Sequence, residues 1–366
     1  MQMLRKILAL SIAVLCMPFL QAADNPPGAE RVATIKKIKA EAMKASTDLD
    51  AKVETVKSQA EAKRLQLAYV TTVKALLDRA VKLFQEVPND AAAADAAFFV
   101  YEYGTEEQIE SAATQILANN LNDSRLRSAI ASAEGYGENA LPFLKELVKK
   151  APQKDEQALA SFVLGRYFAE KSEMSGDKPE IAQKYGKLAE GHYEQAVAIK
   201  SDAKLGRNST VGSAVKDELY TLQTLSIGKP APDFEGVAFD GTKTKLSSLR
   251  GKVVVLDFWQ TTCGPCLAMI PHTRTLVKEL ADKPFVFVGI NLDANKATGR
   301  KFAAEKSFSW PQWWSHPEEG PADQYRVHFY PSIYVIDAKG RIRYKHLDHR
   351  TLAKKVEELV KEAEGK

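Results

Sequence analysis

Two cysteines, Cys263 and Cys266, stand close together with only Gly264 and Pro265 between them, directly after an apolar run. The chain has three cysteines in all, and the third is Cys16, near its start. Two thiols at this spacing can close into a disulfide and exchange with the disulfide of another molecule. A loop with two intervening residues constrains the unfolded chain less than a long loop does, so a purely structural staple explains the pair poorly. The spacing therefore favours redox chemistry.

The position of the pair between a strand and a helix predicts a role for each sulfur. Cys263 would face the free N–H groups of a helix that Pro265 opens, and this setting stabilises a thiolate. We expect Cys263 to attack a substrate disulfide and the more buried Cys266 to resolve the mixed disulfide. Asp257, on the preceding strand, would point towards that helix and accept the Cys266 proton. The alternative for Asp257 is a hydrogen-bonded polar residue at a strand end.

The elements that must position these residues are an alternation of strands and helices after residue 226. The first two strands are continuous apolar runs, which is typical of buried central strands. A turn at 338–340 predicts an antiparallel last hairpin. The C-terminal part is thus predicted to be an α/β fold. We expect strands at 252–259, 285–292, 332–337 and 341–347, and helices at 265–282, 294–306 and 351–363.

The part of the chain before residue 226 has a different character. Residues 28–225 are rich in Ala, Lys, Glu and Leu at helical spacing, which predicts an all-α domain that begins with a long helical hairpin or a short coiled coil. Partner binding is the candidate role of this domain. A glycine- and proline-containing stretch at 226–236 marks the boundary, so the fold class is two-domain. One helix pair resembles a tetratricopeptide hairpin in which glycine admits close helix packing. The residues of that pattern are Leu164, Gly165, Phe168, Ala189, Tyr193 and Ala196.

Residues 1–23 are interpreted as a secretory signal peptide. Arg5 and Lys6 precede an apolar run at 7–20 that is too short for a comfortable membrane span, and small residues follow it. We expect an exported protein, periplasmic or extracytoplasmic, with cleavage near Ala22 or Ala23. Retention of the segment as a membrane anchor is the alternative. Hydrophobic residues make up 45% of the chain and the net charge is +4 without a basic block, so no nucleic-acid partner is expected.

The motif DFWxxxCGPC, followed by Pro271, resembles thioredoxin. The stretches at 228–234, 246–259 and 330–344 are similar to the exported TlpA/ResA branch of that superfamily, so the resemblance covers about residues 226–366. It implies a thioredoxin-like fold and a thiol-disulfide oxidoreductase whose redox-active disulfide replaces any cofactor, and the motif favours a protein disulfide reductase. Two positions depart from the pattern: Thr262 stands where tryptophan is usual, and Gly289 stands where thioredoxin carries a buried lysine.

The resemblance also implies a substrate-binding surface. Pro331 matches the cis-proline beside the active cysteines, which would present the backbone of Tyr330 to an extended substrate. Trp259 matches an active-site tryptophan that offers a flat apolar platform, and Gly264 and Pro265 would line the same contact. The implied partners are protein thiols or disulfides and an upstream electron donor, neither of which the sequence identifies.

Three alternatives to a disulfide reductase stay open. A zinc site would need a second close pair of ligands, and His272 is the one histidine near the cysteines in sequence. A peroxiredoxin-like thiol peroxidase would need a threonine and a proline where Gln260 and Leu256 stand. In the third alternative the helical domain is a non-enzymatic docking module and the redox domain only regulates it.

Overall fold

The computed structural model describes residues 28–175, 178–316 and 320–365. The expected signal peptide at 1–23 lies outside these residues. The chain divides into two compact units. The N-terminal unit comprises the described residues up to Tyr167 together with Gly191–Gly212, and the C-terminal unit comprises Phe168–Glu190 and the residues from Ser213 onward. No helix of the described residues is long and apolar enough to cross a membrane.

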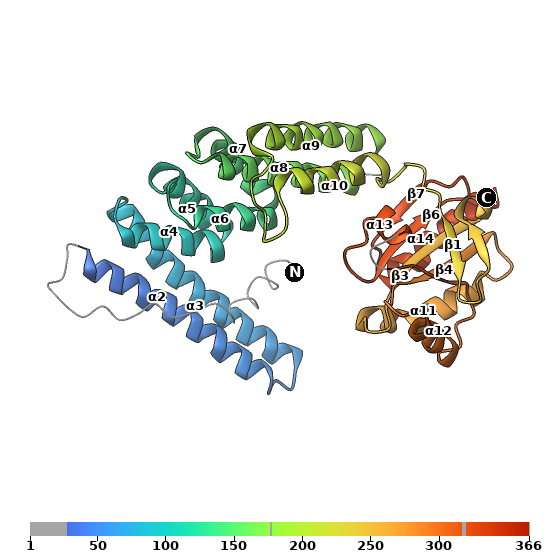
Figure 1. Cartoon of the computed structure of the whole chain (residues 1–366). Coiled ribbons are helices and arrows are strands. Elements are labelled where there is room, and N and C mark those ends of the chain that lie inside the picture. The colour runs from blue at the N-terminus through green and yellow to red at the C-terminus, as the bar shows by residue number, and fades with distance from the viewer. Residues whose placement is uncertain (1–27, 176–177, 317–319, 366) are drawn as a thin grey trace. The chain divides into compact units, whose positions relative to one another are not determined.

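The first two helices form the predicted long hairpin, α2 (Ala29–Val53) and α3 (Gln59–Glu86), drawn in blue in Figure 1. Side chains cap the N-termini of α3 and of the next helix, α4 (Ala91–Tyr103). Ser58 Oγ accepts a hydrogen bond from the Glu61 N–H at 3.2 Å, and Asp90 Oδ1 accepts one from the Ala93 N–H at 2.7 Å. The remaining helices are α5 (Glu106–Asn119), α6 (Leu126–Ala133), η2 (Glu134–Ala140), α7 (Leu141–Lys150), α8 (Lys154–Met174), α9 (Pro179–Lys200) and α10 (Val211–Thr224).

A glycine allows two of these helices to approach closely, as the helix-hairpin pattern predicts. Gly165 of α8 faces Tyr193 of α9, and a Cβ at Gly165 would lie 2.4 Å from the tyrosine ring. Tyr193 is fully buried at this crossing. A larger residue at position 165 would push the two helices apart, because packed interiors have no spare volume.

The C-terminal unit contains a seven-stranded sheet in the order β2-β1-β5-β4-β3-β6-β7. Its strands are drawn in yellow to red in Figure 1. Strands β3 and β4 lie at its centre, pair in parallel and are buried almost throughout, as their apolar sequences predict. Strands β6 and β7 form the predicted antiparallel hairpin. The strands are β1 (Glu235–Ala238), β2 (Lys243–Lys245), β3 (Val253–Trp259), β4 (Phe285–Asn291), β5 (Gln312–Trp314), β6 (Ser332–Ile336) and β7 (Ile342–Lys345).

Helices cover both faces of this sheet. On one face, α11 (Gly264–Glu279) and α14 (His349–Ala363) contribute apolar side chains to a core with alternate residues of β3, β4 and β6. The remaining short helices of this part are η3 (Leu246–Leu249), α12 (Lys296–Glu305) and α13 (Pro321–Gln324). Cys263 and Cys266 therefore lie at the start of a helix that packs against the central strands.

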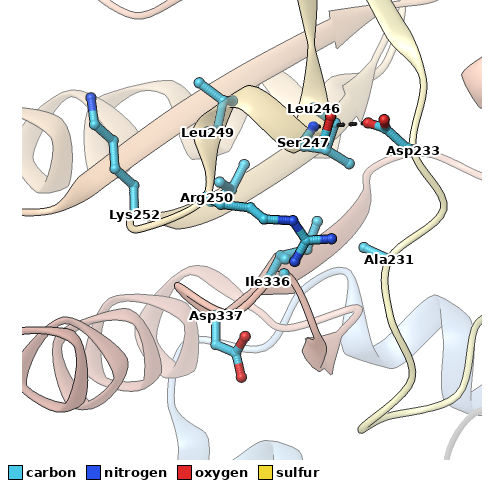
Figure 2. A pocket seen from close by; sticks show the side chains of 11 residues that line it. Ala231, Asp233, Leu246, Ser247, Leu249, Arg250, Lys252, Ile336 and Asp337 are labelled. Atoms are coloured by element: carbon cyan, nitrogen blue, oxygen red, sulfur yellow. Dashed lines mark hydrogen bonds between the residues drawn. The ribbon is translucent and has the colours of Figure 1, made fainter.

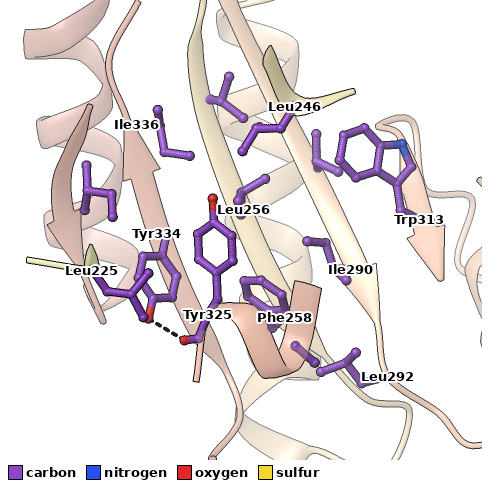
Figure 3. Packing of buried hydrophobic residues seen from close by; sticks show 14 residues of the cluster. Leu225, Leu246, Leu256, Phe258, Ile290, Leu292, Trp313, Tyr325, Tyr334 and Ile336 are labelled. Atoms are coloured by element: carbon purple, nitrogen blue, oxygen red, sulfur yellow. Dashed lines mark hydrogen bonds between the residues drawn. The ribbon is translucent and has the colours of Figure 1, made fainter. Parts of the chain in front are cut away.

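The core of the opposite face extends beyond the expected domain boundary (Figure 3). Leu225, just after α10, is fully buried among sheet residues that include Phe258 and Tyr334. Tyr220 of α10 also donates a hydrogen bond from its hydroxyl to the Gln324 carbonyl at 3.0 Å. The end of α10 is thus part of the C-terminal unit.

A small cavity lies where the chain enters the sheet (Figure 2). Asp233 accepts a hydrogen bond there from the Ser247 N–H at 2.8 Å, and the Arg250 side chain crosses the space beside Ala231. Its volume of about 20 Å³ holds little more than one water molecule. This cavity therefore does not provide a substrate site.

Candidate active site

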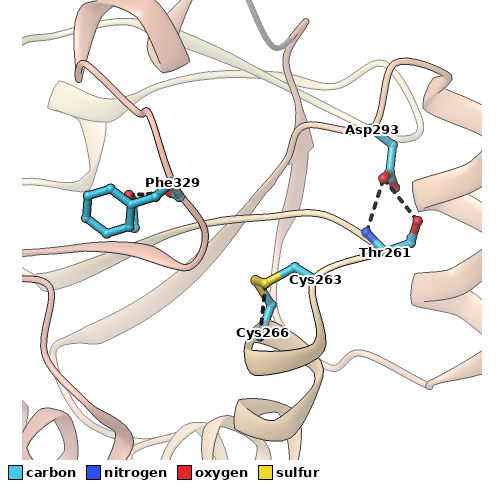
Figure 4. The surroundings of a disulfide bond; sticks show 6 residues. Thr261, Cys263, Cys266, Asp293 and Phe329 are labelled. Atoms are coloured by element: carbon cyan, nitrogen blue, oxygen red, sulfur yellow. Dashed lines mark hydrogen bonds between the residues drawn. A yellow bond between two sulfur atoms is a disulfide. The ribbon is translucent and has the colours of Figure 1, made fainter. Parts of the chain in front are cut away.

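The cysteine pair lies where β3 gives way to α11 (Figure 4). Cys263 and Cys266 form a disulfide with an S–S distance of 2.00 Å. Cys263 is the N-cap residue of α11, and its Sγ accepts a hydrogen bond from the Cys266 N–H at 3.1 Å. Pro265 stands in the first helical turn, where no N–H is needed. The helix therefore presents free N–H groups to the Cys263 sulfur, the setting that lowers a thiol's pKa in the reduced state.

The two sulfurs differ in exposure as the sequence predicts. Cys266 is buried, with 5% of its surface exposed, whereas Cys263 is half-buried and its neighbours Gly264 and Pro265 are exposed. An incoming disulfide can therefore reach Cys263 first. Cys266 is protected from outside reagents and remains one turn away.

An acidic residue that sequence reasoning missed holds the loop before the cysteines. Asp293 follows β4, and its Oδ1 accepts hydrogen bonds from the Thr261 N–H at 3.1 Å and from the Thr261 hydroxyl at 3.0 Å (Figure 4). Its Oδ2 accepts from Asn291 Nδ2 at 2.9 Å, and its carbonyl accepts from Trp314 Nε1 at 2.9 Å. This carboxylate ties the loop to the ends of β4 and β5. The only sequence signal for it is an aspartate directly after a buried strand.

Asp257 lies in the middle of β3, on the sheet face that α11 covers. The residue as a whole is half-buried, but its Oδ1 is sealed from solvent and has no hydrogen-bond partner among the described residues. Burial raises the pKa of Asp257 from 3.8 to about 7. No hydrogen bond between Asp257 and either cysteine is found within the described part of the chain. A carboxyl with a pKa near neutrality can exchange protons at physiological pH.

Trp259 is placed differently from the expected platform. It is 3% exposed, and its Nε1 donates a buried hydrogen bond to Gln312 Oε1 at 3.0 Å. A side chain this buried does not fit the role of a flat surface for a substrate. Its position at the end of β3, followed by a turn into α11, explains the burial, because the last strand residue still faces the core.

The exposed aromatic residue in the surroundings of the disulfide is Phe329 (Figure 4). Its side chain is 54% exposed, and its carbonyl accepts a hydrogen bond from the Ser332 hydroxyl at 2.7 Å. The Tyr330–Pro331 peptide bond that follows is cis, as the resemblance implied. The Phe329 ring lies against His346, with ring centroids 4.9 Å apart, and about half of the residue stays exposed.

No group of three or more His, Cys, Asp or Glu side chains within residues 28–175, 178–316 and 320–365 could hold a metal ion. His272 stacks on His349 with ring centroids 4.0 Å apart, and neither belongs to such a group.

The sheet, the cysteine pair on α11 and the adjacent cis-proline define a thioredoxin-like domain with a dithiol site. A family model described as the AhpC/TSA family matches residues 227–345. The chain is also similar to "Thioredoxin-like protein YneN" of Bacillus subtilis (strain 168), with 35% identity over 139 residues, which are 37% of this chain and 80% of that protein. The chain belongs, through this part, to the AhpC/TSA family of redoxins.

A further relative is named for this class of chemistry. "Thiol-disulfide oxidoreductase ResA" of Oceanobacillus iheyensis is 32% identical over 121 residues, which are 32% of this chain and 62% of that protein. The solved thioredoxin domain of a thiol-disulfide oxidoreductase of Bacteroides vulgatus is 27% identical and covers 37% of this chain and 99% of its own, with a TM-score of 0.35. The enzyme class is that of the thiol-disulfide oxidoreductases, which use a cysteine pair.

Proposed function

We propose that the protein is an exported protein disulfide reductase. The observation that carries this proposal is the disulfide-bonded pair at the N-terminus of α11, with Cys263 accessible and Cys266 buried. A structural disulfide would have no use for this asymmetry, whereas an exchange reaction requires it. The export rests on the signal-like residues 1–23, and the domains we propose are 28–225 and 226–366.

The reaction begins with the reduced pair. The Cys263 thiolate attacks one sulfur of a substrate disulfide, forms a mixed disulfide and releases the other substrate sulfur as a thiolate that takes a proton from solvent. Cys266 then gives its proton to Asp257 and attacks Cys263 Sγ. The second substrate sulfur leaves as a thiolate and takes a proton from solvent, Asp257 returns its proton to solvent, and the Cys263–Cys266 disulfide remains. Two electrons have passed to the substrate, and an upstream thiol donor must return them.

The substrate would lie against the surface made by Phe329, Tyr330 and Pro331. The Tyr330 backbone can pair with an extended peptide, and the exposed Phe329 ring can cover an apolar side chain next to the substrate cysteine. Gly264 and Pro265 directly follow Cys263, are exposed and leave room for that peptide, because nothing lies within 4 Å of a Cβ at Gly264.

Insulin reduction by the dithiol form tests the proposal. The wild type should reduce insulin with turnover when a small dithiol regenerates it, and Cys263→Ser should abolish the activity. Cys266→Ala is the matched variant: it should react once with the substrate and accumulate a mixed disulfide at Cys263. An inactive wild type, or an active Cys263→Ser variant, would contradict the proposal.

Export has its own test. The protein recovered from an extracytoplasmic fraction should lack about the first 23 residues by mass spectrometry, as expected for a cleaved signal peptide. Recovery of the intact chain in the membrane fraction would instead support a retained anchor.

A further inference from the structure

Three residues lie in one row across the centre of the sheet. Asp257 of β3 is paired with Gly289 of β4, and Gly289 is paired with Gln312 of β5. Residues paired in register across neighbouring strands point to the same face, and each strand is about 4.8 Å from the next. Asp257 and Gln312 therefore share the face that α11 covers, with a residue that has no side chain between them.

The Gln312 side chain fills the space that a side chain at position 289 would otherwise occupy. A Cβ at Gly289 would lie 2.4 Å from Gln312 Oε1 and 2.5 Å from Gln312 Nε2, so the carboxamide rests directly over the glycine. The amide has thereby crossed from β5 to β4 and stands about one strand spacing, ~4.8 Å, from the Asp257 position. A side chain at position 289 would occupy the space that the Gln312 carboxamide fills and would keep it from reaching towards Asp257.

The orientation of the amide follows from its one partner. Trp259 Nε1 donates to Gln312 Oε1 at 3.0 Å, and an indole N–H can only donate, so the oxygen must face the tryptophan. The amide nitrogen Nε2 is then turned away from Trp259. Among the described residues Nε2 is a buried donor without a partner, and Asp257 Oδ1 is a buried acceptor without a partner. Two such atoms in one row of a sheet face are complementary, because a buried polar atom is costly unless it is paired.

Few other groups on this face could pair with Asp257. Its second strand neighbour, on β6, is Ile333. The buried residues of α11 are Cys266, Met269, Thr273 and Leu276, those of α12 are Gly299 and Ala303, and those of α14 are Leu352, Val356, Leu359 and Val360. Cys266 is the single titratable side chain among these, and burial rather than a neighbouring charge raises the pKa of Asp257.

We propose that Gln312 is a positioning residue for Asp257, whose ionised carboxylate is linked to Gln312 Nε2 by hydrogen bonds through one water. The inference rests on the proposed function, in which Asp257 takes the proton of Cys266. This link stabilises the charged form of the carboxylate and so opposes the effect of burial. It also fixes the direction of the carboxylate, because Trp259 holds the other end of the amide. Gln312 thereby keeps Asp257 available as a base near neutral pH.

The titration of Asp257 in the oxidised full-length protein tests this role, because neither cysteine titrates in the disulfide. The ¹³Cγ signal of Asp257, assigned by its loss in Asp257→Asn, is followed against pH by NMR. In Gln312→Met the pKa of Asp257 should rise by about one, a tenfold change in proton binding. Gln312→Glu keeps the acceptor for Trp259 but loses the donor, and should raise the pKa at least as much.

The matched control is Gln115→Met in α5. Gln115 is also buried and donates from Nε2, to the Pro88 carbonyl at 2.5 Å, but it lies in the other unit. This variant should leave the Asp257 titration unchanged. An Asp257 pKa in both Gln312 variants within about 0.2 of the wild type would overturn the proposal.

The reduced protein supplies the second measurement. The rate at which Cys266 resolves a mixed disulfide at Cys263 should depend on pH with a midpoint that moves upward in Gln312→Met, and the same substitution should have no effect on the profile of Asp257→Asn. A shifted titration with an unmoved rate profile would overturn the positioning role. If the wild type fails to reduce insulin, the proposed function fails, whereas the NMR titration still decides whether Gln312 binds Asp257.

Discussion

Replacement of Asp257 by asparagine should raise the free energy of unfolding of the C-terminal unit relative to the wild type. This gain should be larger at neutral pH than at acid pH. Burial raises the pKa of Asp257 from 3.8 to about 7 in the folded protein. The folded state therefore holds a proton that the unfolded chain has already lost between about pH 4 and pH 7, and stability falls as pH rises through that window. The penalty is complete above about pH 7 and is absent well below pH 4.

The size of the effect follows from the difference of about three between the two pKa values. At 1.36 kcal/mol for each pKa unit this amounts to about 4 kcal/mol, and the residual solvent exposure of Asp257 reduces the expected value to about 2–4 kcal/mol. Asparagine does not titrate, so the difference between variant and wild type in free energy of unfolding should grow by this amount from pH 4 to pH 8.

Urea unfolding followed by tryptophan fluorescence is the suitable assay. The four tryptophans, Trp259, Trp310, Trp313 and Trp314, all lie after residue 226, so the signal reports the C-terminal unit and not the helical one. The measurement uses the oxidised protein and compares midpoints and slopes at both pH values. A free-energy difference between variant and wild type that is the same at pH 4 and pH 8 would refute the buried-carboxylate reasoning.

Three further substitutions separate packing from function. Gly165→Ala should destabilise the helical unit by about 1–3 kcal/mol, because the new methyl group meets the Tyr193 ring, and circular dichroism should show an earlier melt with unchanged tryptophan unfolding. Leu225→Ala should cost about 2–5 kcal/mol in the fluorescence-detected transition, since Leu225 is fully buried. Phe329→Ala should change stability by less than about 0.5 kcal/mol but raise KM for a disulfide peptide with apolar flanks; an unchanged KM would remove Phe329 from the substrate surface.

Much of the fold could be predicted because its central strands carry a strong local signal. The runs that became β3 and β4 are long and apolar, and the observed helix at Gly264–Glu279 begins at the expected place. Strands β1, β2 and β5 carry no such signal, because each is only three or four residues long and none contains a long apolar run. Such segments become strands through pairing with neighbours distant in sequence, which no local period records.

The residues of the candidate site also differ in how far the sequence predicts them. The roles expected of Cys263 and Cys266 follow from spacing, and the structure agrees on which sulfur is buried. Asp293 and Gln312 could not be predicted, since their contacts join loops and strands that only the sheet order brings together. Trp259 shows the converse case: a family likeness suggested a surface role, but its register on β3 turns it inward.

The unequal burial of the two sulfurs also sets how the protein can be damaged. An alkylating agent or a strong oxidant would react with Cys263 of the reduced pair, because Cys266 is buried. One lesion on that atom would end electron transfer while every core contact stays in place. Molecules damaged in this way would stay folded. If Phe329 binds substrates as proposed, they would compete with intact copies for the same substrates.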